Sequence, residues 1–300
     1  MKILIADDDA VSRRMMNGIL VHAGYEVVAV ENGRQAVDAL GAADGPRLAL
    51  IDWVMPELDG PGVCGELRTL SDRSYVYIIL LTSKDSKSDI VAGLEAGADD
   101  FLTKPCNADE VKARLRTGQR ILQLEDKLVE AREEMRYKAT HDGLTRLWNR
   151  GAILSLLDRE LNRMQREGGM LSLLLCDLDH FKRVNDTHGH LVGDEVLQEL
   201  GNRLAAAVRP YDSVGRYGGE EFLVLLSGCN EALTAQRADE IHNSIRSIPF
   251  QTANGPLSLT ISIGVRTCCH SSEVTAEELL NDADQALYRA KAKGRDCVSL

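Results

Sequence analysis

The chain has 300 residues, which suggests about two domains, and its hydrophobic fraction of 44% is ordinary for a globular protein. Its formal net charge of −11 argues against nonspecific binding to nucleic acid or anionic lipid, because both require a basic surface. The seven cysteines form no C-x-x-C pair, and no apolar run is long enough to span a bilayer. We therefore expect a reduced, cytoplasmic protein with no membrane insertion.

Short apolar runs alternate with helical patterns from residue 1 to about residue 118. The runs are Ile3–Ala6, Val27–Val30, Leu48–Ile51, Val76–Leu81 and Phe101–Leu102. This alternation predicts β-α-β units, and hence an α/β domain with a doubly wound parallel sheet and helices on both faces.

Polar residues follow the ends of these apolar runs. They are Asp7 and Asp8 after the first run, Asp52 after the third, Thr82 after the fourth and Lys104 after the fifth. In a doubly wound sheet all of these positions lie at the carboxyl edge, where ligands bind. Three carboxylates there would repel one another without a divalent cation, and hard oxygen ligands suit Mg²⁺. The hydroxyl and the ammonium complete a site for a phosphoryl group.

These residues, together with Trp53–Pro56 and the Lys104-Pro105 pair, resemble a response-regulator receiver domain of flavodoxin-like fold over residues 1–118. The resemblance implies that Asp52 accepts a phosphoryl group from a sensor histidine kinase. It also implies one Mg²⁺ ion held by Asp7, Asp8, Asp52 and the carbonyl of Val54, and a switch formed by Thr82, Lys104 and Phe101. The alternative is that Asp7 and Asp8 only cap the first helix, which explains neither Asp52 nor Lys104.

A charged helical segment follows, and we assign residues 119–137 to a linker between two domains. Apolar residues repeat at spacings of three and four along it: Ile121, Leu124, Leu128, Ala131 and Met135. This a/d seam of about two heptads favours a parallel homodimer. The alternative is a helix that packs only on its own domain.

Residues 216–222 read R-Y-G-G-E-E-F between two apolar runs, which predicts a β-hairpin with a turn at Gly218-Gly219. Glycines let a bulky ligand approach the backbone, and Glu220 and Glu221 can hold a cation beside it. Asp177 ends another apolar run, so Asp177 and Glu221 suit Mg²⁺ beneath a nucleoside triphosphate. A tight turn with solvated acids is the simpler alternative. Alternation over residues 257–265 predicts a further strand.

Three polar residues near Asp177 fit the rest of a nucleotide. Lys182 supplies positive charge for phosphates. Asn185 and Asp194 suit a guanine edge, because a carboxylate accepts from the N1–H and N2–H donors that adenine lacks as a pair.

Residues 138–300 resemble a GGDEF-type diguanylate cyclase in the segments Asp142–Arg150, Asp177–Asp186, Gly193-Asp194 and the hairpin. The resemblance implies an α/β fold of the nucleotidyl-cyclase and polymerase-palm type, and condensation of two GTP into cyclic di-GMP with release of pyrophosphate. It implies two Mg²⁺ ions held by Asp177, the carbonyl of Leu178, Glu220 and Glu221. It implies catalysis by Glu220, Glu221 and Lys182, with substrate contacts from Asn185, Asp194, Gly218, Gly219, Lys291 and Arg295. Which glutamate binds metal and which acts as the base stays open, and Lys291 and Arg295 can instead serve only the helix dipole.

The segment Arg209-Pro210-Tyr211-Asp212 matches the R-x-x-D inhibitory site of this family in type and in spacing to Gly218. Arginine forks onto phosphate or guanine, and aspartate accepts N–H donors, so cyclic di-GMP is expected to inhibit here. An accidental ion pair at a helix end is the alternative. Arg237 and His242 are the candidates for a supporting cation, and neither matches the family clearly.

Together these patterns predict a phosphorylation-controlled diguanylate cyclase in which two GTP-loaded domains face each other in a C₂ homodimer. One alternative is a catalytically weak regulator that only senses cyclic di-GMP or GTP. Two others are a phosphorelay regulator with a structural C-terminal domain, and a cyclase that makes a mixed dinucleotide. The intact acids and Lys182 argue against a sensor, and Asp194 argues for guanine.

Overall fold

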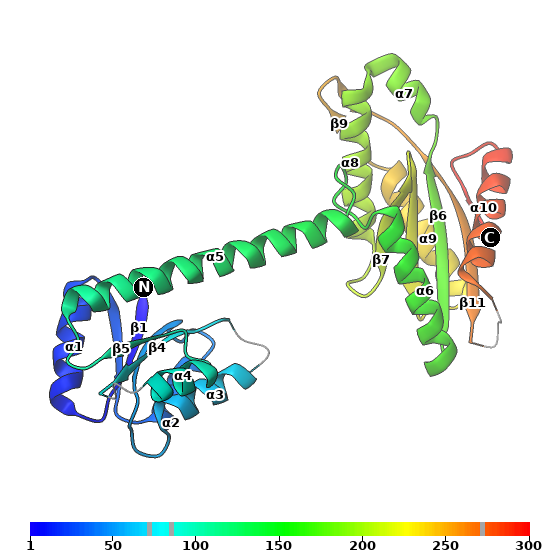
Figure 1. Cartoon of the computed structure of the whole chain (residues 1–300). Helices are drawn as coiled ribbons and strands as arrows, with labels where there is room; N and C mark the ends of the chain where they lie inside the picture. Colours follow the sequence, from blue (N-terminus) through cyan, green and yellow to red (C-terminus); the bar gives the residue numbers. More distant parts are fainter. Residues whose placement is uncertain (71–73, 84–86, 271–273) are drawn as a thin grey trace. The chain divides into compact units, whose positions relative to one another are not determined.

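The structure is a computed structural model that describes residues 1–70, 74–83, 87–270 and 274–300, with the side chains of 87–89 left out. The chain divides into two compact units, Met1–Glu133 and Glu134–Leu300 (Figure 1). Each unit has its own sheet and its own buried core, so each is described separately.

The first unit contains a parallel five-stranded sheet in the order β2-β1-β3-β4-β5. Its strands are β1 (Lys2–Ala6), β2 (Glu26–Val30), β3 (Leu48–Asp52), β4 (Tyr77–Thr82) and β5 (Asp100–Thr103). Its helices are α1 (Ala10–His22), α2 (Gly33–Leu40), α3 (Gly60–Thr69), α4 (Lys87–Glu95) and α5, which begins at Ala108. Each apolar run predicted from the sequence forms a strand, and the doubly wound, flavodoxin-like prediction is confirmed.

Helices cover both sides of this sheet (Figure 1), and they contact it through apolar side chains. Met16 and Leu20 of α1 and Leu115 of α5 pack on one face. Leu40 of α2 and Val63 of α3 pack on the other face. With its faces buried, the sheet is open to ligands at its carboxyl edge, where β1, β3, β4 and β5 end.

Helix α5 (Ala108–Thr140) is continuous, and the Asn107 side chain accepts from the Asp109 amide at 2.9 Å to start it. One stripe packs on the first unit through Val111, Leu115, Gly118 and Leu122. The seam residues Leu124, Leu128 and Met135 are 59%, 64% and 71% exposed. Because an α-helix turns by about 100° for each residue, these seam residues lie roughly 130° around the helix axis from the packed stripe. The seam and the stripe are therefore on different faces of α5. Over the described ranges, no helix is both long enough and apolar enough to cross a membrane.

The second unit contains a five-stranded sheet in the order β12-β11-β6-β8-β7. Its strands are β6 (Met170–Leu178), β7 (Ser213–Gly218), β8 (Glu221–Ser227), β11 (Ile261–Cys269) and β12 (Val298–Ser299). The pairs β11–β6, β6–β8 and β7–β8 are antiparallel, whereas β12 is parallel to β11. A separate small ribbon is formed by β9 (Phe250–Thr252) and β10 (Gly255–Leu257).

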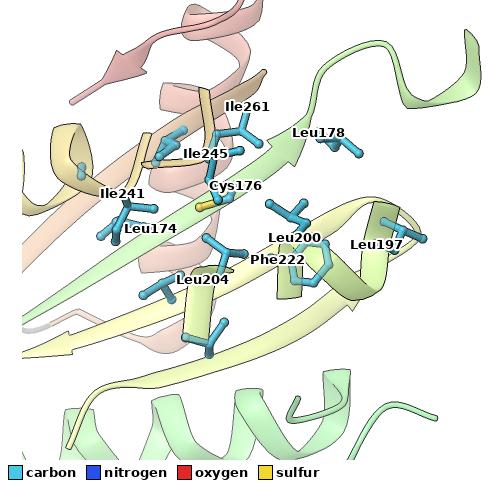
Figure 2. Close-up of a cluster of buried hydrophobic side chains, with 14 of the residues drawn as sticks. Leu174, Cys176, Leu178, Leu197, Leu200, Leu204, Phe222, Ile241, Ile245 and Ile261 are labelled. Atoms are coloured by element: carbon cyan, nitrogen blue, oxygen red, sulfur yellow. The ribbon is translucent and has the colours of Figure 1, made fainter. Parts of the chain in front are cut away.

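Helices cover both faces of this second sheet. They are α6 (Arg150–Glu167), α7 (Phe181–His188), α8 (His190–Ala207), α9 (Glu231–Arg246) and α10 (Ala276–Ala292). Figure 2 shows Leu200 of α8 and Ile241 of α9 packed with Cys176 and Phe222 of the sheet. On the opposite face, α6 and α10 enclose a second buried cluster. The α/β prediction for this unit is confirmed, and β6 is its central strand.

Two local predictions need correction. The strand predicted over residues 257–265 begins only at Ile261, because its neighbour β6 ends at Leu178, the residue opposite Ile261. Leu257 instead ends β10. The hairpin exists, but Gly218 pairs with Glu221, so Gly219 and Glu220 form the turn in place of the two glycines.

Candidate functional site

The acidic residues of the first unit meet at the predicted edge of its sheet. Asp7, Asp8 and Asp52 each offer one carboxylate oxygen, and these oxygens lie within 4.8 Å of one another. Lys104 Nζ lies 2.8 Å from Asp7 Oδ2 and 3.0 Å from Asp52 Oδ2. The helix cap at this edge is Asp9, whose carboxylate accepts from the amides of α1, so capping does not account for the other acids.

Burial sets the electrostatics of this edge. It raises the pKa of the Asp52 carboxyl, and the Lys104 ammonium only partly opposes that effect. Burial alone would lower the pKa of Lys104, but hydrogen bonds to Asp7 and Asp52 outweigh it and raise that pKa. Asp7 is buried, Asp52 is half-buried and Asp8 is exposed. Three carboxylates with the Lys104 ammonium against two of them favour a further cation, and carboxylate oxygens are the ligands that Mg²⁺ prefers.

The other predicted receiver residues lie in the neighbouring strands β4 and β5 or just after β3. Thr82 ends β4 and is buried, and Phe101 lies in β5 and is half-buried. Val54 follows β3 and is 63% exposed. Its predicted part in the metal site is played by its backbone carbonyl, not by its side chain.

Four residues of the second unit come together where the end of β6 meets the hairpin turn before β8. Asp177 of β6 and Glu221 of β8 are direct cross-strand neighbours. The Leu178 amide donates to the carbonyl of Glu220 at 3.3 Å, which joins the turn to the end of β6. Gly219 has a φ of +38°, a left-handed conformation that disfavours a side chain at the turn. The acids predicted to share a metal are thus adjacent.

The two adjacent carboxylates share a partly buried environment. Burial raises the pKa of Asp177, and the Lys291 ammonium, 2.8 Å from Asp177 Oδ2, opposes it. Burial also raises the pKa of Glu221, and the negative charge of Asp177 adds to this. Both effects disfavour two bare anions side by side, so a cation between them is favourable. Lys291 contacts Asp177 here, and its contact with phosphate remains a prediction.

A cleft of about 890 Å³ opens beside Glu221. It is bounded by α6 and by the first turns of α10, and Asp158, Glu277 and Asp284 line it together with Tyr217. Asp284 also contributes to the raised pKa of Glu221. The cleft on this side of Glu221 therefore adds further acids to the hairpin pair, which favours binding of cations there.

The predicted guanine-reading residues lie on consecutive helices. Asn185 is on α7 and the exposed Asp194 is on α8. Gly193 packs directly against Asn185, because a Cβ there would overlap Asn185 Oδ1 and lie 3.2 Å from Phe181 Cζ. Because Gly193 has no side chain, the Asn185 amide can lie against α8 at the position directly before Asp194. Lys182 is exposed in the first turn of α7.

Sequence reasoning missed a pair of residues that holds the hairpin turn. Arg216 Nε donates to the carbonyl of Gly219 at 2.9 Å, and its Nη1 lies 3.2 Å from Asp142 Oδ1. The same oxygen accepts from the amide and the hydroxyl of Thr145, both at 2.9 Å. Burial would raise the pKa of Asp142, but these hydrogen bonds and Arg216 outweigh it and leave that pKa below its ordinary value. Both residues lie inside motifs visible in the sequence, but nothing in their spacing pairs them.

The predicted product site lies just before β7. Asp212 accepts from the Arg209 amide at 3.0 Å and from the Ser227 amide at 3.3 Å, so its carboxylate closes a turn. The Arg209 guanidinium donates to the Tyr211 hydroxyl at 2.8 Å. Pockets of about 390 and 400 Å³ both include Arg209 in their walls.

The two candidates for a supporting cation at this product site, Arg237 and His242, contact different parts of the second unit. Arg237 donates to the carbonyl of Ala207 at 2.6 Å, two residues before Arg209. His242 is buried and contacts Asp296. Of the two, Arg237 is the one beside the R-x-x-D segment.

A family model for the GGDEF domain of diguanylate cyclases matches residues 139–297, and a model for the response regulator receiver domain matches residues 3–116. The chain belongs to the diguanylate cyclase GGDEF domain family. The resemblance read from the sequence is therefore confirmed for both domains.

Relatives of this family differ in how much of the chain they share. The response regulator PleD of Caulobacter vibrioides is 33% identical over 99% of this chain, which spans 65% of the length of PleD. The diguanylate cyclase DgcP of Pseudomonas aeruginosa is 43% identical over 55% of this chain and 24% of its own length. The crystal structure of the coiled coil and GGDEF domain of DgcB from Caulobacter crescentus, in complex with c-di-GMP, is 30% identical with a TM-score of 0.57. It covers 63% of this chain and 98% of that one.

Proposed function

We propose that this chain is a phosphorylation-controlled diguanylate cyclase that condenses two GTP into cyclic di-GMP and releases two pyrophosphates. The receiver domain comprises residues 1–118, the helical linker 119–137 and the cyclase domain 138–300. The observation that carries the proposal is the cross-strand pair of the buried Asp177 and the half-buried Glu221, beside an open glycine turn, with Lys291 against Asp177. The names of the relatives support the same reaction.

Two Mg²⁺ ions would be held at the hairpin by Asp177, the carbonyl of Leu178, Glu220 and Glu221. When bound, these ions would polarise the α-phosphorus and neutralise the leaving pyrophosphate. Lys182, Lys291 and Arg295 add positive charge for the phosphates. Asn185 and Asp194 hold the guanine edge, and Gly218 and Gly219 leave room for the sugar and phosphates.

In each half-reaction the 3′-hydroxyl oxygen of one GTP bonds to the α-phosphorus of the other. The bond from that phosphorus to the bridging oxygen breaks, and pyrophosphate leaves with its electron pair. The hydroxyl proton passes to a hairpin carboxylate, Glu220 or Glu221. Because one domain seats one GTP, two domains must face each other, and C₂ symmetry aligns each hydroxyl with the opposite phosphorus.

The apolar seam of α5 supports such a homodimer. Leu124, Leu128 and Met135 are exposed on a helix face turned away from the stripe that packs on the receiver. A second copy can cover this seam without displacing the receiver. We expect Leu128→Glu to convert the full chain to monomer in sedimentation velocity and to abolish turnover, whereas the exposed Val129→Glu, off the seam, leaves the dimer intact. A Leu128→Glu dimer would contradict the seam.

Phosphorylation of Asp52 by a sensor histidine kinase is the proposed input. One Mg²⁺ ion would be held by Asp7, Asp8, Asp52 and the carbonyl of Val54. The phosphoryl group would then attract Lys104 and Thr82, with Phe101 as the switching aromatic, and shift the dimer population. Beryllofluoride, which mimics the acyl phosphate, should raise turnover in the wild type but not in Asp52→Asn.

Product feedback is proposed at Arg209 and Asp212. The guanidinium of Arg209 is exposed between two pockets, where it can fork onto a phosphate or a guanine. Arg209→Ala should relieve inhibition by cyclic di-GMP and leave the KM for GTP near wild type. Unchanged inhibition would exclude this site.

The decisive experiment is incubation of the full chain with GTP and Mg²⁺, followed by mass analysis of the products. We expect cyclic di-GMP from the wild type and none from Glu221→Gln. Glu277→Gln is the matched control, because it removes an acid of the same cleft that is not on the hairpin. If the beryllofluoride-treated wild type forms no cyclic dinucleotide but binds cyclic di-GMP, the chain is a sensor and the proposed reaction is wrong.

A further inference from the structure

The loop between α10 and β12 has an unusual backbone. Gly294, Arg295 and Asp296 have φ values of +109°, +66° and +47°, so three consecutive residues are left-handed. This conformation is easy for glycine but strained for residues with a Cβ. Strained residues persist only where their surroundings hold them, and such strain is often kept at functional sites.

Asp296 is the residue through which the loop is held. Its amide donates to Asp179 Oδ2 at 3.1 Å. Asp179 is 2% exposed, and its carboxylate also accepts from the hydroxyls of Thr260 and Ser262 at 2.7 and 2.8 Å. The backbone of the loop is thus tied to the end of β6, two residues from Asp177.

The side chain of Asp296 has two partners on α9. His242 Nε2 lies 2.9 Å from Asp296 Oδ1, and Arg246 Nη1 lies 3.3 Å from Oδ2. An ionised carboxylate only accepts, so Nε2 of His242 carries the hydrogen and donates it. His242 is 8% exposed and Arg246 is 58% exposed, so water screens the arginine far more than the histidine. His242 is therefore the main anchor.

The residue displayed by this loop is Arg295. It is exposed and directly precedes Asp296, whose amide is tied to the end of β6 through Asp179. Lys291, four residues earlier on α10, contacts Asp177 at the end of the same strand. The backbone of Arg295 is thus held at the end of β6 that already carries one cation, and its conformation depends on the strained loop.

We propose that His242 is a positioning residue that, through Asp296, fixes the left-handed loop so that Arg295 faces the triphosphate of the bound nucleotide. The inference rests on the proposed function, since it assigns the loop to the same GTP site. His242 itself touches no substrate. This role also distinguishes His242 from the supporting cation of the product site, for which the sequence had made it a candidate.

The test compares binding of two ligands by the full chain in Mg²⁺, measured by calorimetry. The ligands are the α-thio analogue of GTP, which has the full triphosphate, and GMP, which lacks the two outer phosphates. In His242→Leu the donor is lost at similar volume, and we expect the triphosphate to bind about tenfold more weakly with GMP unchanged. In His242→Gln the side-chain amide reaches where Nε2 was, so most of the affinity should return. Arg246→Gln is the matched control and should change neither ligand.

Two results would overturn the inference: equal triphosphate affinity in the wild type and His242→Leu, or an equal loss for both ligands. If His242→Leu fails to fold, His242→Asn replaces it, because its shorter amide does not reach Asp296. If the wild type binds the analogue and forms no product from GTP, the proposed reaction is wrong. The comparison of ligand affinities between the wild type and His242→Leu still decides the role of His242. If the wild type does not bind the analogue, both fail.

Discussion

Replacing Arg216 tests whether one pair of charges sets the shape of the hairpin turn. The Arg216 and Asp142 side chains are 19% and 23% exposed, so solvent screens their attraction only partly. Arg216→Gln removes this ion pair and the charge-assisted bond to the carbonyl of Gly219. Such a bond contributes ~1.5–3 kcal/mol and the ion pair about 1 kcal/mol, so the second unit should lose about 3 kcal/mol of unfolding free energy.

Thermal unfolding and turnover measure the two consequences of that loss. For a unit of this size, about 3 kcal/mol corresponds to a decrease of roughly 6–12 °C in unfolding temperature. Because Glu220 and Glu221 directly follow Gly219, a shift of the turn by about 1 Å should lower kcat by roughly 100-fold. Arg216→Lys keeps the charge but not the fork, so it should recover stability better than turnover.

A double-mutant cycle with Asp142→Asn separates the pair from its surroundings. If the two single effects on unfolding free energy add to within about 0.5 kcal/mol, the side chains act independently and the reasoning is refuted.

Acid titration of the folded protein gives a second check. Since the folded pKa of Asp142 lies below its ordinary 3.8, its stabilisation is complete above that pH and is lost as the pH falls through the folded pKa. The difference between wild type and Asp142→Asn should therefore shrink only below about pH 4.

The remaining predictions concern the helices predicted to bind guanine, α7 and α8, and the carboxyl edge of the receiver sheet. Gly193→Ala should push the Asn185 amide aside and raise the KM for GTP about tenfold, which corresponds to a loss of about 1.4 kcal/mol in binding free energy. The unfolding temperature should change little, and an unchanged KM in steady-state kinetics would contradict this prediction. Mg²⁺ at ten times its dissociation constant should stabilise the receiver by about 1.4 kcal/mol through mass action, and Asp52→Asn should lose most of that gain; equal melting shifts in both proteins would exclude Asp52 from the metal site.

Much of the fold was predictable because it follows from local patterns. The parallel strand ends place Asp7, Asp52 and Lys104 at one edge by topology alone, and the structure confirms this. The strand over residues 257–265 was misplaced because its alternation continues beyond the end of its neighbour β6, and alternation carries no information about a partner. Sequence patterns specify which face is buried but not where pairing stops.

The supporting contacts of the sites were not predictable for a different reason. Arg216 and Asp142 are separated by 74 positions, and His242 and Asp296 by 54. Each contact joins elements whose meeting depends on the whole packing, so no periodicity or spacing pairs them. The motif residues were visible in the sequence, whereas the residues that orient them appear only in three dimensions.

Both acidic sites contain a lysine whose ammonium lies 2.8 Å from a carboxylate oxygen, Lys104 on Asp7 and Lys291 on Asp177. The protein thus carries its own counter-ion at each site. An incoming Mg²⁺ must compete with that ammonium, which lowers metal affinity but frees the lysine to meet an arriving phosphate. Metal and phosphate should therefore bind more tightly together than either binds alone, in both units of the chain.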